Sequence, residues 1–208
     1  MKVNTADGRL RSFLEALEGE PLLTEFNTLR LAMSIPDVLR WIIRKLDSSR
    51  RGYLLGLARR SGLSVYEVWS VLADLLEMRK KWSAAFEELG IDAVVFPGMP
   101  IPAFPHGMSS KLTAPVTYMF IANLLLWPCG TVPVTTVKSE EENYNMDDIP
   151  PNQRDSISKL VQQSMKGSSG LPMSVSVMCP AFRDETCLKI MKDVESFADF
   201  KAEPKAYY

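Results

Sequence analysis

Apolar residues repeat at helical spacing along the first part of the chain. Leucine, phenylalanine and methionine recur every three or four residues between positions 22 and 33. The segment Ser34–Asp37 then predicts a new helix start, because proline fits the first helical turn and an acid is favourable there. The next helix carries Leu39, Ile42, Ile43 and Leu46 on one side. We therefore expect two or three short amphipathic helices before residue 62.

A longer helical stripe follows these short helices. Ser64 and Glu67 have the spacing of a capping box, in which each side chain accepts a hydrogen bond from a free amide of the first turn. Apolar residues keep helical spacing from Val65 to Leu89, and Gly90 predicts the end of the helix. We interpret the stripe as part of the core or as a face for a partner helix, with core favoured.

Strand and helix signals alternate in the remainder of the chain. Residues 91–96, a segment ending at Val137, and residues 171–178 have strand patterns, whereas residues 115–126, 156–165 and 184–200 have helix patterns. This alternation predicts the α/β class, with a mostly parallel sheet covered by helices. The acidic, polar stretch 138–155 predicts a surface insertion.

One uncharged run, from Leu112 to Val137, is long enough to span a bilayer. Three prolines at positions 115, 128 and 133 fall inside it, and each removes a backbone donor where lipid supplies no water. We therefore interpret the run as a buried helix, a corner and a strand, with no transmembrane helix. The charged N-terminal segment also lacks the apolar region of a signal peptide.

Composition narrows the class of protein. The chain has 208 residues, of which 46% are apolar and 24% charged, as in a soluble globular domain. Its net charge of −1 gives no general attraction to nucleic acid. Three cysteines, an odd number without a close pair, predict reduced thiols and an intracellular location.

The charge balance differs locally between Pro21 and Gly62. This segment has eight bases against three acids. Such helices lie on a membrane surface, or they are ordinary surface helices whose apolar side faces the domain, and composition does not separate the two. The candidate membrane-contacting residues are Arg40, Trp41, Ile42, Ile43, Arg44, Tyr53 and Leu54.

The sequence contains few candidate residues for catalysis or for metal binding. His106 is the single histidine, and no GxSxG motif is present to supply the serine of a Ser-His-acid triad. The cysteines at 129, 179 and 187 do not have the spacing of zinc ligands. The sequence also contains no phosphate-binding or dinucleotide-binding motif. We expect no metal and no cofactor. The segment Lys166–Gly170 places a lysine beside two serines, and a Ser–Lys pair acts in catalysis when the lysine is buried and neutral. A polar turn is the favoured interpretation, and the cysteines are interpreted as small apolar fillers.

The segment from Trp82 to Phe197 resembles the C-terminal part of hydrolases of the amidase signature family. The resemblance rests on residues 89–97 (LGIDAVVFP), 128–137 (PCGTVPVTTV), 170–175 (GLPMSV) and 184–188 (DETCL). The extended VPVTTV strand and the acidic insertion are similar to the branch that hydrolyses fatty acid amides to a fatty acid and an amine. The resemblance implies the C-terminal part of an α/β/α fold, with a mixed sheet covered by helices, an N-terminal helical cap over residues 1–62 and an incomplete domain over residues 63–208.

The resemblance also implies what is missing. Family members hydrolyse amides with a Ser–Ser–Lys triad, which lies in a Gly/Ser-rich signature and a lysine strand upstream of the region represented here. Neither occurs in this chain, so no catalytic residue carries over, and we expect the chain alone to be inactive. We interpret it as a fragment, a truncated gene model or a short isoform.

Three positions match the acyl-channel wall of the family by the alignment through Tyr118: Thr113, Val116 and Phe120. Each could equally be plain core. The implied partners are a lipid amide substrate in the complete enzyme, a peripheral or monotopic membrane contact, and a possible homodimer, with no nucleic acid. The alternative functions are a non-enzymatic membrane- or lipid-binding module using residues 21–62, or a regulatory partner that pairs through the helix 65–89.

Overall fold

The computed structural model describes residues 11–21, 31, 34–46, 62–109, 111–112, 115, 117–151 and 154–201. The chain forms two compact units, residues 1–78 and residues 79–208, which are described separately. Most of the predicted helical repeat at 22–33 lies outside the described residues, as do Tyr53 and Leu54. The predicted division into a cap (1–62) and an incomplete α/β domain (63–208) stays a prediction.

The first unit contains the short helices α1 (Arg11–Ala16) and α3 (Asp37–Leu46) and the first turns of α5 (Val65–Leu89). Helix α3 begins where Ser34–Asp37 predicts a helix start, so that prediction is confirmed. The capping box is also confirmed. The Ser64 amide donates to Glu67 Oε2 at 2.9 Å, and the Glu67 amide donates to Ser64 Oγ at 3.2 Å. Helix α5 ends at Leu89, and Gly90 follows with a positive φ of 62°.

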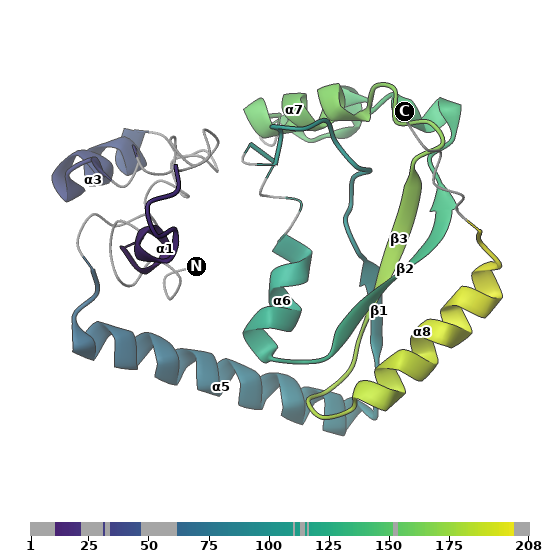
Figure 1. Ribbon diagram of the computed structural model, residues 1–208, viewed down its shortest axis with the longest axis horizontal. Coiled ribbons are helices and arrows are strands. Elements are labelled where there is room, and N and C mark those ends of the chain that lie inside the picture. The colour runs from purple at the N-terminus through teal and green to yellow at the C-terminus, as the bar shows by residue number, and fades with distance from the viewer. Residues whose placement is uncertain are drawn as a thin grey trace. The chain divides into compact units, whose positions relative to one another are not determined.

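The second unit is built on a three-stranded sheet with strand order β1-β3-β2 (Figure 1). The strands are β1 (Val94–Pro97), β2 (Cys129–Thr136) and β3 (Pro172–Met178). Met178 of β3 faces Val94 on one side and Cys129 on the other. The other elements of this unit are the helices α6 (Thr117–Leu125), α7 (Ser156–Met165) and α8 (Asp184–Ala198) and the 3-10 turns η2 (Ser139–Glu142) and η3 (Met146–Asp148).

The alternation of helices and strands is confirmed, but the expectation of mostly parallel pairing is wrong. Strand β3 lies between β1 and β2 and pairs antiparallel with both. The reason is that α7 does not carry the chain across the sheet. The Val137 amide donates to Leu171 O and the Gly170 amide donates to Val137 O, both at 2.9 Å, so β3 begins where β2 ends. The segment 138–169 is therefore a long insertion in a hairpin, not a crossover.

Helices cover the two faces of the sheet. Neighbouring residues of a strand point to opposite faces, so Val177 and Met178 lie on different sides. On the Val177 side, α8 packs on β2 and β3 through Ile190, Met191 and Val194. On the Met178 side lie α6 and the last turns of α5. Figure 1 shows the sheet between α6 and α8. The cover of helices is as expected, but the three described strands pair only antiparallel and do not form the mixed sheet that the family resemblance implies.

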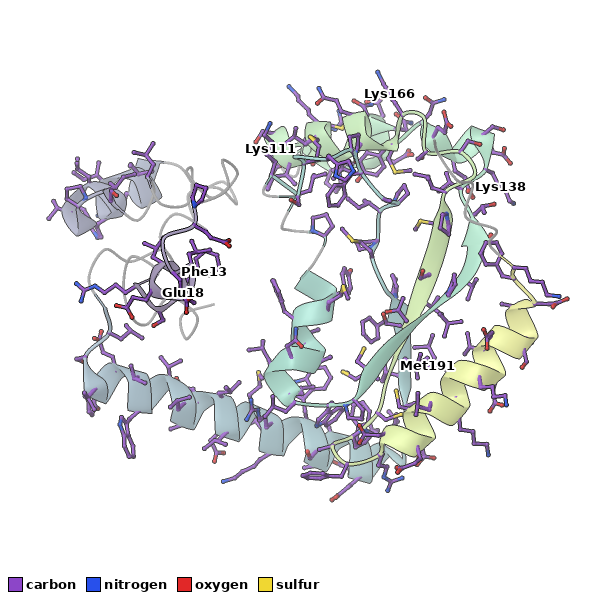
Figure 2. All side chains as sticks on the ribbon, in the orientation of Figure 1. Phe13, Glu18, Lys111, Lys138, Lys166 and Met191 are labelled. Atoms are coloured by element: carbon purple, nitrogen blue, oxygen red, sulfur yellow. The ribbon has the colours of Figure 1, made fainter. Side chains whose placement is uncertain are left out.

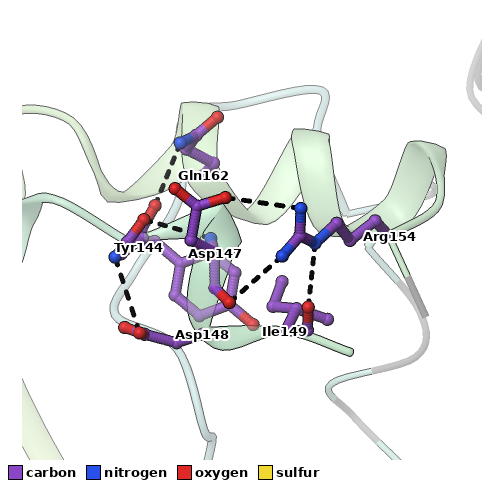
Figure 3. Close-up of polar contacts among 7 residues, drawn as sticks. Tyr144, Asp147, Asp148, Ile149, Arg154 and Gln162 are labelled. Carbon is purple, nitrogen blue, oxygen red and sulfur yellow. Dashed lines mark hydrogen bonds and ion pairs between the residues drawn. The ribbon is translucent and has the colours of Figure 1, made fainter. Parts of the chain in front are cut away.

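The acidic insertion lies at the surface, as predicted, and is held by Arg154 (Figure 3). Arg154 Nε donates to Ile149 O at 2.8 Å, and its Nη2 donates to Asp147 O at 3.1 Å. Its Nη1 lies 3.3 Å from Asp147 Oδ1. Gln162 of α7 donates to Tyr144 O at 3.0 Å. One guanidinium thus fixes two carbonyls, and the insertion is tied to the helix that follows it.

The core interpretation of the long stripe is wrong for most of its length. Of the apolar side chains of α5, only Phe86 is buried, whereas Val65, Trp69, Leu76 and Leu89 are exposed. Burial is concentrated near the C-terminal end of α5, where Trp127, from the chain after α6, packs against Phe86 and Trp82. Among the helices of the described residues, none is both long and apolar enough to cross a bilayer.

Candidate functional site

The segment Lys166–Gly170, which imitates a catalytic pair, forms a structural turn. Lys166 is exposed, whereas the Ser168 hydroxyl is buried and donates to Met165 O at 2.6 Å (Figure 2). The Ser169 amide donates to Glu142 Oε1 at 2.7 Å. A Ser–Lys mechanism needs a lysine that burial keeps neutral, and this lysine is not buried. The interpretation as a polar turn is therefore confirmed.

Helix α6 carries the one predicted channel residue that the structure describes. Phe120 is 48% exposed, so it is not core. Thr113 and Val116 lie outside the described residues. Several neighbours of Phe120 on the same helix are also apolar and exposed, namely Tyr118, Met119 and Leu124. Helix α6 thus presents an apolar surface that no described residue covers.

An apolar pocket of about 110 Å³ lies between α6 and the sheet. Its lining atoms are all apolar, and it is bounded by Trp82, Val94, Phe96, Tyr118, Ile121 and Met178. Ligand sites for whole drug-sized molecules measure roughly 300–1,000 Å³. A pocket of this size therefore fits a few methylene groups of a longer ligand.

An aromatic cluster fixes one wall of this pocket. The ring of Trp127 packs edge-on against Phe86, with centroids 4.7 Å apart and planes at 81°, and against Trp82 at 6.3 Å. Arg79 Nε donates to Leu124 O at 2.6 Å, which satisfies a carbonyl in the last turn of α6. These contacts connect the end of α5, α6 and the corner before β2. They hold Trp82 where it lines the pocket.

The predicted membrane-contacting residues of the first unit lie partly in α3. Trp41 is 59% exposed, Ile42 is also exposed and Ile43 is half-buried. Lys45 Nζ lies 4.3 Å from the centre of the Trp41 ring, within cation–π range. Arg40 and Arg44 belong to α3, and their side chains are outside the described atoms.

The three cysteines, distant in the sequence, gather at one end of the sheet. The Cys179 amide donates to Pro128 O at 3.1 Å. The Cys187 thiol lies 3.7 Å from the same oxygen and 3.4 Å from Val177 O. Cys179 and Cys187 are buried, which confirms the filler interpretation for them, whereas Cys129 is exposed.

Burial disfavours the charged thiolate of Cys179 and of Cys129. Burial, followed by the neighbouring Cys187, raises the pKa of Cys179 from 9.0 to about 11. Burial, followed by the charge of Cys187, also raises the pKa of Cys129. An open hollow of about 300 Å³ adjoins the cluster, and its lining includes Cys129, Cys187 and Met191. The nucleophile of a thiol is its thiolate, so Cys179 and Cys129 are poor nucleophiles at neutral pH.

Within the part of the chain that the structure describes, no group of three His, Cys, Asp or Glu side chains could hold a metal ion. His106 is exposed in its loop.

Neither the pocket nor the cluster of cysteines was predicted from the sequence. Two sequence features indicate the pocket residues: Val94 and Phe96 alternate along a strand, and Tyr118 and Ile121 lie three residues apart on a helix. The cysteines had none, because their meeting depends on how β2, β3 and α8 pack.

The chain is similar to one protein family and to fatty acid amide hydrolases of two animals. The family model named Amidase matches residues 40–188. Fatty-acid amide hydrolase 1 of the pig, Sus scrofa, is 33% identical over 167 residues, which are 80% of this chain and 28% of that protein. Fatty acid amide hydrolase 1 of Caenorhabditis elegans is 27% identical over 174 residues, which are 81% of this chain and 30% of that protein. The chain thus spans less than a third of the length of either relative.

Proposed function

We propose, because the chain belongs to the amidase family, that it is a section of a serine amidohydrolase that hydrolyses fatty acid amides. In this proposal α6 and the pocket beside it hold part of the acyl chain of the substrate. The wholly apolar lining of that pocket carries the proposal. The similarity to two fatty acid amide hydrolases supports this substrate class.

The chemistry of the pocket favours a hydrocarbon ligand. It offers no polar lining atom to a ligand, so a group that needs hydrogen bonds would lose them on entry. Each methylene removed from water contributes about 0.8 kcal/mol. The exposed Phe120 extends the apolar surface beyond the pocket, as the acyl-channel prediction requires. The roles of Thr113 and Val116 remain part of this proposal.

Binding of an acyl-chain series tests the proposal. Calorimetric titration of the 208-residue chain with primary fatty amides of increasing length should show an affinity that rises about fourfold per methylene and then levels off once the pocket is full. Ile121→Trp, which fills the pocket, should weaken binding. Leu188→Trp is the matched control, because Leu188 is exposed on α8, on the other side of the sheet. Affinities that ignore chain length, or an equal loss in both variants, would contradict the proposal.

We further propose that this chain alone hydrolyses no amide. The described turn at residues 166–170 has an exposed lysine, and the family resemblance carries no residue of the Ser–Ser–Lys triad onto this chain. Incubation with a long-chain amide should therefore release no fatty acid, as measured by mass spectrometry. Turnover that Ser169→Ala or Lys166→Ala abolishes would contradict this.

A second candidate function, membrane-surface binding, is favoured by the exposed apolar side chains of α3. Trp41, Leu39 and Val38 are more than half exposed, and eight bases lie in the segment 21–62. Helices with an apolar side and flanking bases bind anionic bilayers. In this proposal Arg40, Arg44, Ile42, Ile43, Tyr53 and Leu54 share the contact with Trp41.

Vesicle flotation tests the membrane proposal. Binding to vesicles of phosphatidylserine and phosphatidylcholine should weaken with added salt and in Trp41→Ala. Trp69→Ala is the matched control, since Trp69 is an exposed tryptophan of α5 in the same unit. Salt-independent binding, or equal loss in both tryptophan variants, would exclude α3 as the membrane contact.

A further inference from the structure

We propose that the hydroxyl of Thr131 binds a hydroxyl group on the hydrocarbon chain of the ligand, beside the apolar pocket between α6 and the sheet. The substrate class is then hydroxylated fatty acid amides, in which one polar group interrupts an apolar chain. This inference rests on the proposed function, because the pocket has to hold the neighbouring part of the chain. It adds a polar recognition group next to a pocket whose lining is wholly apolar.

Thr131 lies on the face of the sheet that forms the floor of the pocket. Thr131 of β2 faces Ser176 of β3, and Ser176 faces Phe96 of β1, which lines the pocket. Residues that face each other in neighbouring antiparallel strands point to the same side of the sheet. Met178, which also lines the pocket, is a diagonal neighbour of Thr131, and such neighbours are about 7–8 Å apart. A chain that leaves the pocket across β3 therefore passes Thr131 within a few carbon atoms.

Burial determines the direction of the hydrogen bond between Thr131 and Ser176. Thr131 Oγ1 and Ser176 Oγ are 3.0 Å apart, and either oxygen could carry the donated hydrogen. Ser176 is 1% exposed, and its hydroxyl has no second partner among the described residues, whereas Thr131 is exposed. A buried hydroxyl that does not donate loses its hydrogen bond to water without replacement. Ser176 therefore donates to Thr131, and the Thr131 O–H is left to donate to a ligand.

The absence of a side chain at Gly98 keeps space beside this pair of hydroxyls. Gly98 follows β1 directly, and its amide donates to Ser174 O at 3.2 Å, which holds its backbone against β3. A Cβ at this position would lie 3.1 Å from Ser176 Oγ and 3.2 Å from Thr131 Cγ2. Both distances are shorter than a relaxed contact between carbon atoms. Glycine therefore leaves the side of the pair that faces β1, and so the pocket, free of a side chain.

The groups that Thr131 offers match an alcohol and not a carboxamide. Its O–H is one donor, and its oxygen keeps one lone pair after accepting from Ser176. An alcohol needs one acceptor and one donor, whereas a carboxamide carries two N–H donors besides its accepting oxygen. The pocket lining supplies no further polar atom. A hydroxyl on the chain is therefore satisfied here, while the amide group of the ligand would be left with unpaired donors.

Calorimetric titration of the 208-residue chain with decanamide and its monohydroxy positional isomers tests the inference. The isomers have the same composition, so they differ only in where the hydroxyl meets the protein. One isomer, or two adjacent ones, should bind about fivefold more tightly than the others, the usual contribution of one hydrogen bond. Equal affinities of all isomers would overturn the inference alone if unsubstituted amides keep their dependence on chain length. Absence of binding by every amide would overturn the proposed function as well.

Variants of β2 separate recognition of the ligand from support of the sheet. Thr131→Val keeps the side-chain shape but removes the O–H, so it should abolish the preference among the isomers, whereas Thr131→Ser should retain it. Thr135→Val is the matched control, because Thr135 is an exposed threonine of the same strand whose hydroxyl donates to Thr136 O. A preference that survives Thr131→Val, or is lost equally in Thr135→Val, would overturn the inference. An equal loss of decanamide binding in Thr131→Val would assign this hydroxyl to the amide group instead.

Discussion

The side chain of Met191, on α8, lies directly over the α-carbon of Gly130 in β2, in the space that any larger residue would fill. Gly130 faces Val177 across the sheet, so this contact lies where α8 crosses the two longer strands. Figure 2 shows Met191 on the side of α8 that faces the sheet. The absence of a side chain at position 130 therefore sets how closely α8 approaches.

Adding one carbon at this point is predicted to destabilise the chain. A Cβ at position 130 would overlap the sulfur and methyl group of Met191. Gly130→Ala should lower the free energy of unfolding by about 1–3 kcal/mol, the usual cost of overpacking. Met191→Ala makes room, so the double variant should lose less than the sum of the single losses, by about 0.5–3 kcal/mol. Urea unfolding measures all four proteins, and strictly additive losses would show that the contact is absent.

Trp127→Ala, in the buried aromatic cluster, is predicted to lower the free energy of unfolding more than Trp69→Ala, at an exposed tryptophan. Trp127 is 6% exposed and contacts two other rings, so Trp127→Ala should lose about 3–5 kcal/mol of unfolding free energy. Trp69 is 72% exposed, and Trp69→Ala should change stability by less than about 0.5 kcal/mol. Thermal unfolding with near-ultraviolet circular dichroism compares them. Similar losses in the two variants would mean that the cluster is not the anchor of α5.

Arg154 is predicted to order the acidic insertion through its hydrogen bonds to the carbonyl oxygens of Ile149 and Asp147, and not through its ion pair with the Asp147 carboxylate. Arg154→Lys keeps the charge but cannot donate to both Ile149 O and Asp147 O, so it should speed hydrogen exchange at the Ile149 amide. Asp147→Asn removes only an ion pair whose carboxylate is largely exposed, and such pairs contribute about 0.2–1 kcal/mol. Exchange measured by mass spectrometry should therefore separate the two variants. Faster exchange in Asp147→Asn than in Arg154→Lys would assign the ordering to charge.

Stability is predicted to fall in alkaline solution because of Cys179. Burial, then Cys187, raises the pKa of this thiol from 9.0 to about 11 in the folded chain. Between these values the folded chain binds more protons than the unfolded chain, so unfolding becomes easier as pH rises. The contribution is complete below pH 9 and declines up to about pH 11. In chemical unfolding across this range, Cys179→Ala should show a shallower decline, while His106→Ala, in an exposed loop, should match the wild type. Parallel declines in all three proteins would contradict the prediction.

Elements with local signals were predicted well from the sequence. Helix α7 has the predicted bounds, and Asp155 caps it by accepting hydrogen bonds from the Ile157 and Ser158 amides at 2.9 Å. The start of α5 at Ser64 and its end at Gly90 rest on equally local chemistry. A cap acts within a few residues of its own position, which is why a single sequence shows it.

Features that depend on distant contacts were not predicted. Whether β3 runs parallel or antiparallel to β2 depends on where the chain emerges after the insertion, and residues 138–169 carry no signal for that. The stripe on α5 has a regular helical period, yet only Phe86 is buried, because periodicity identifies an apolar face and not its partner. The candidate site likewise has one part that was predicted from the sequence and one part that was not. Phe120 was predicted from the family resemblance, whereas the pocket beside it requires α5, β1, α6 and β3 together.

The backbone hydrogen bonds among Val137, Gly170 and Leu171 make the pairing of β2 with β3 independent of the length of the segment between these strands. Once these residues are bonded, the register of β2 and β3 no longer depends on how many residues join them. Doubling a loop costs only about 0.6 kcal/mol in closure entropy. The largely exposed stretch 138–150 is therefore the permissive part of this segment, where a tag or a small domain can be inserted while the sheet keeps its strand order, whereas Ile157, Ser164 and Ser168 farther along are buried.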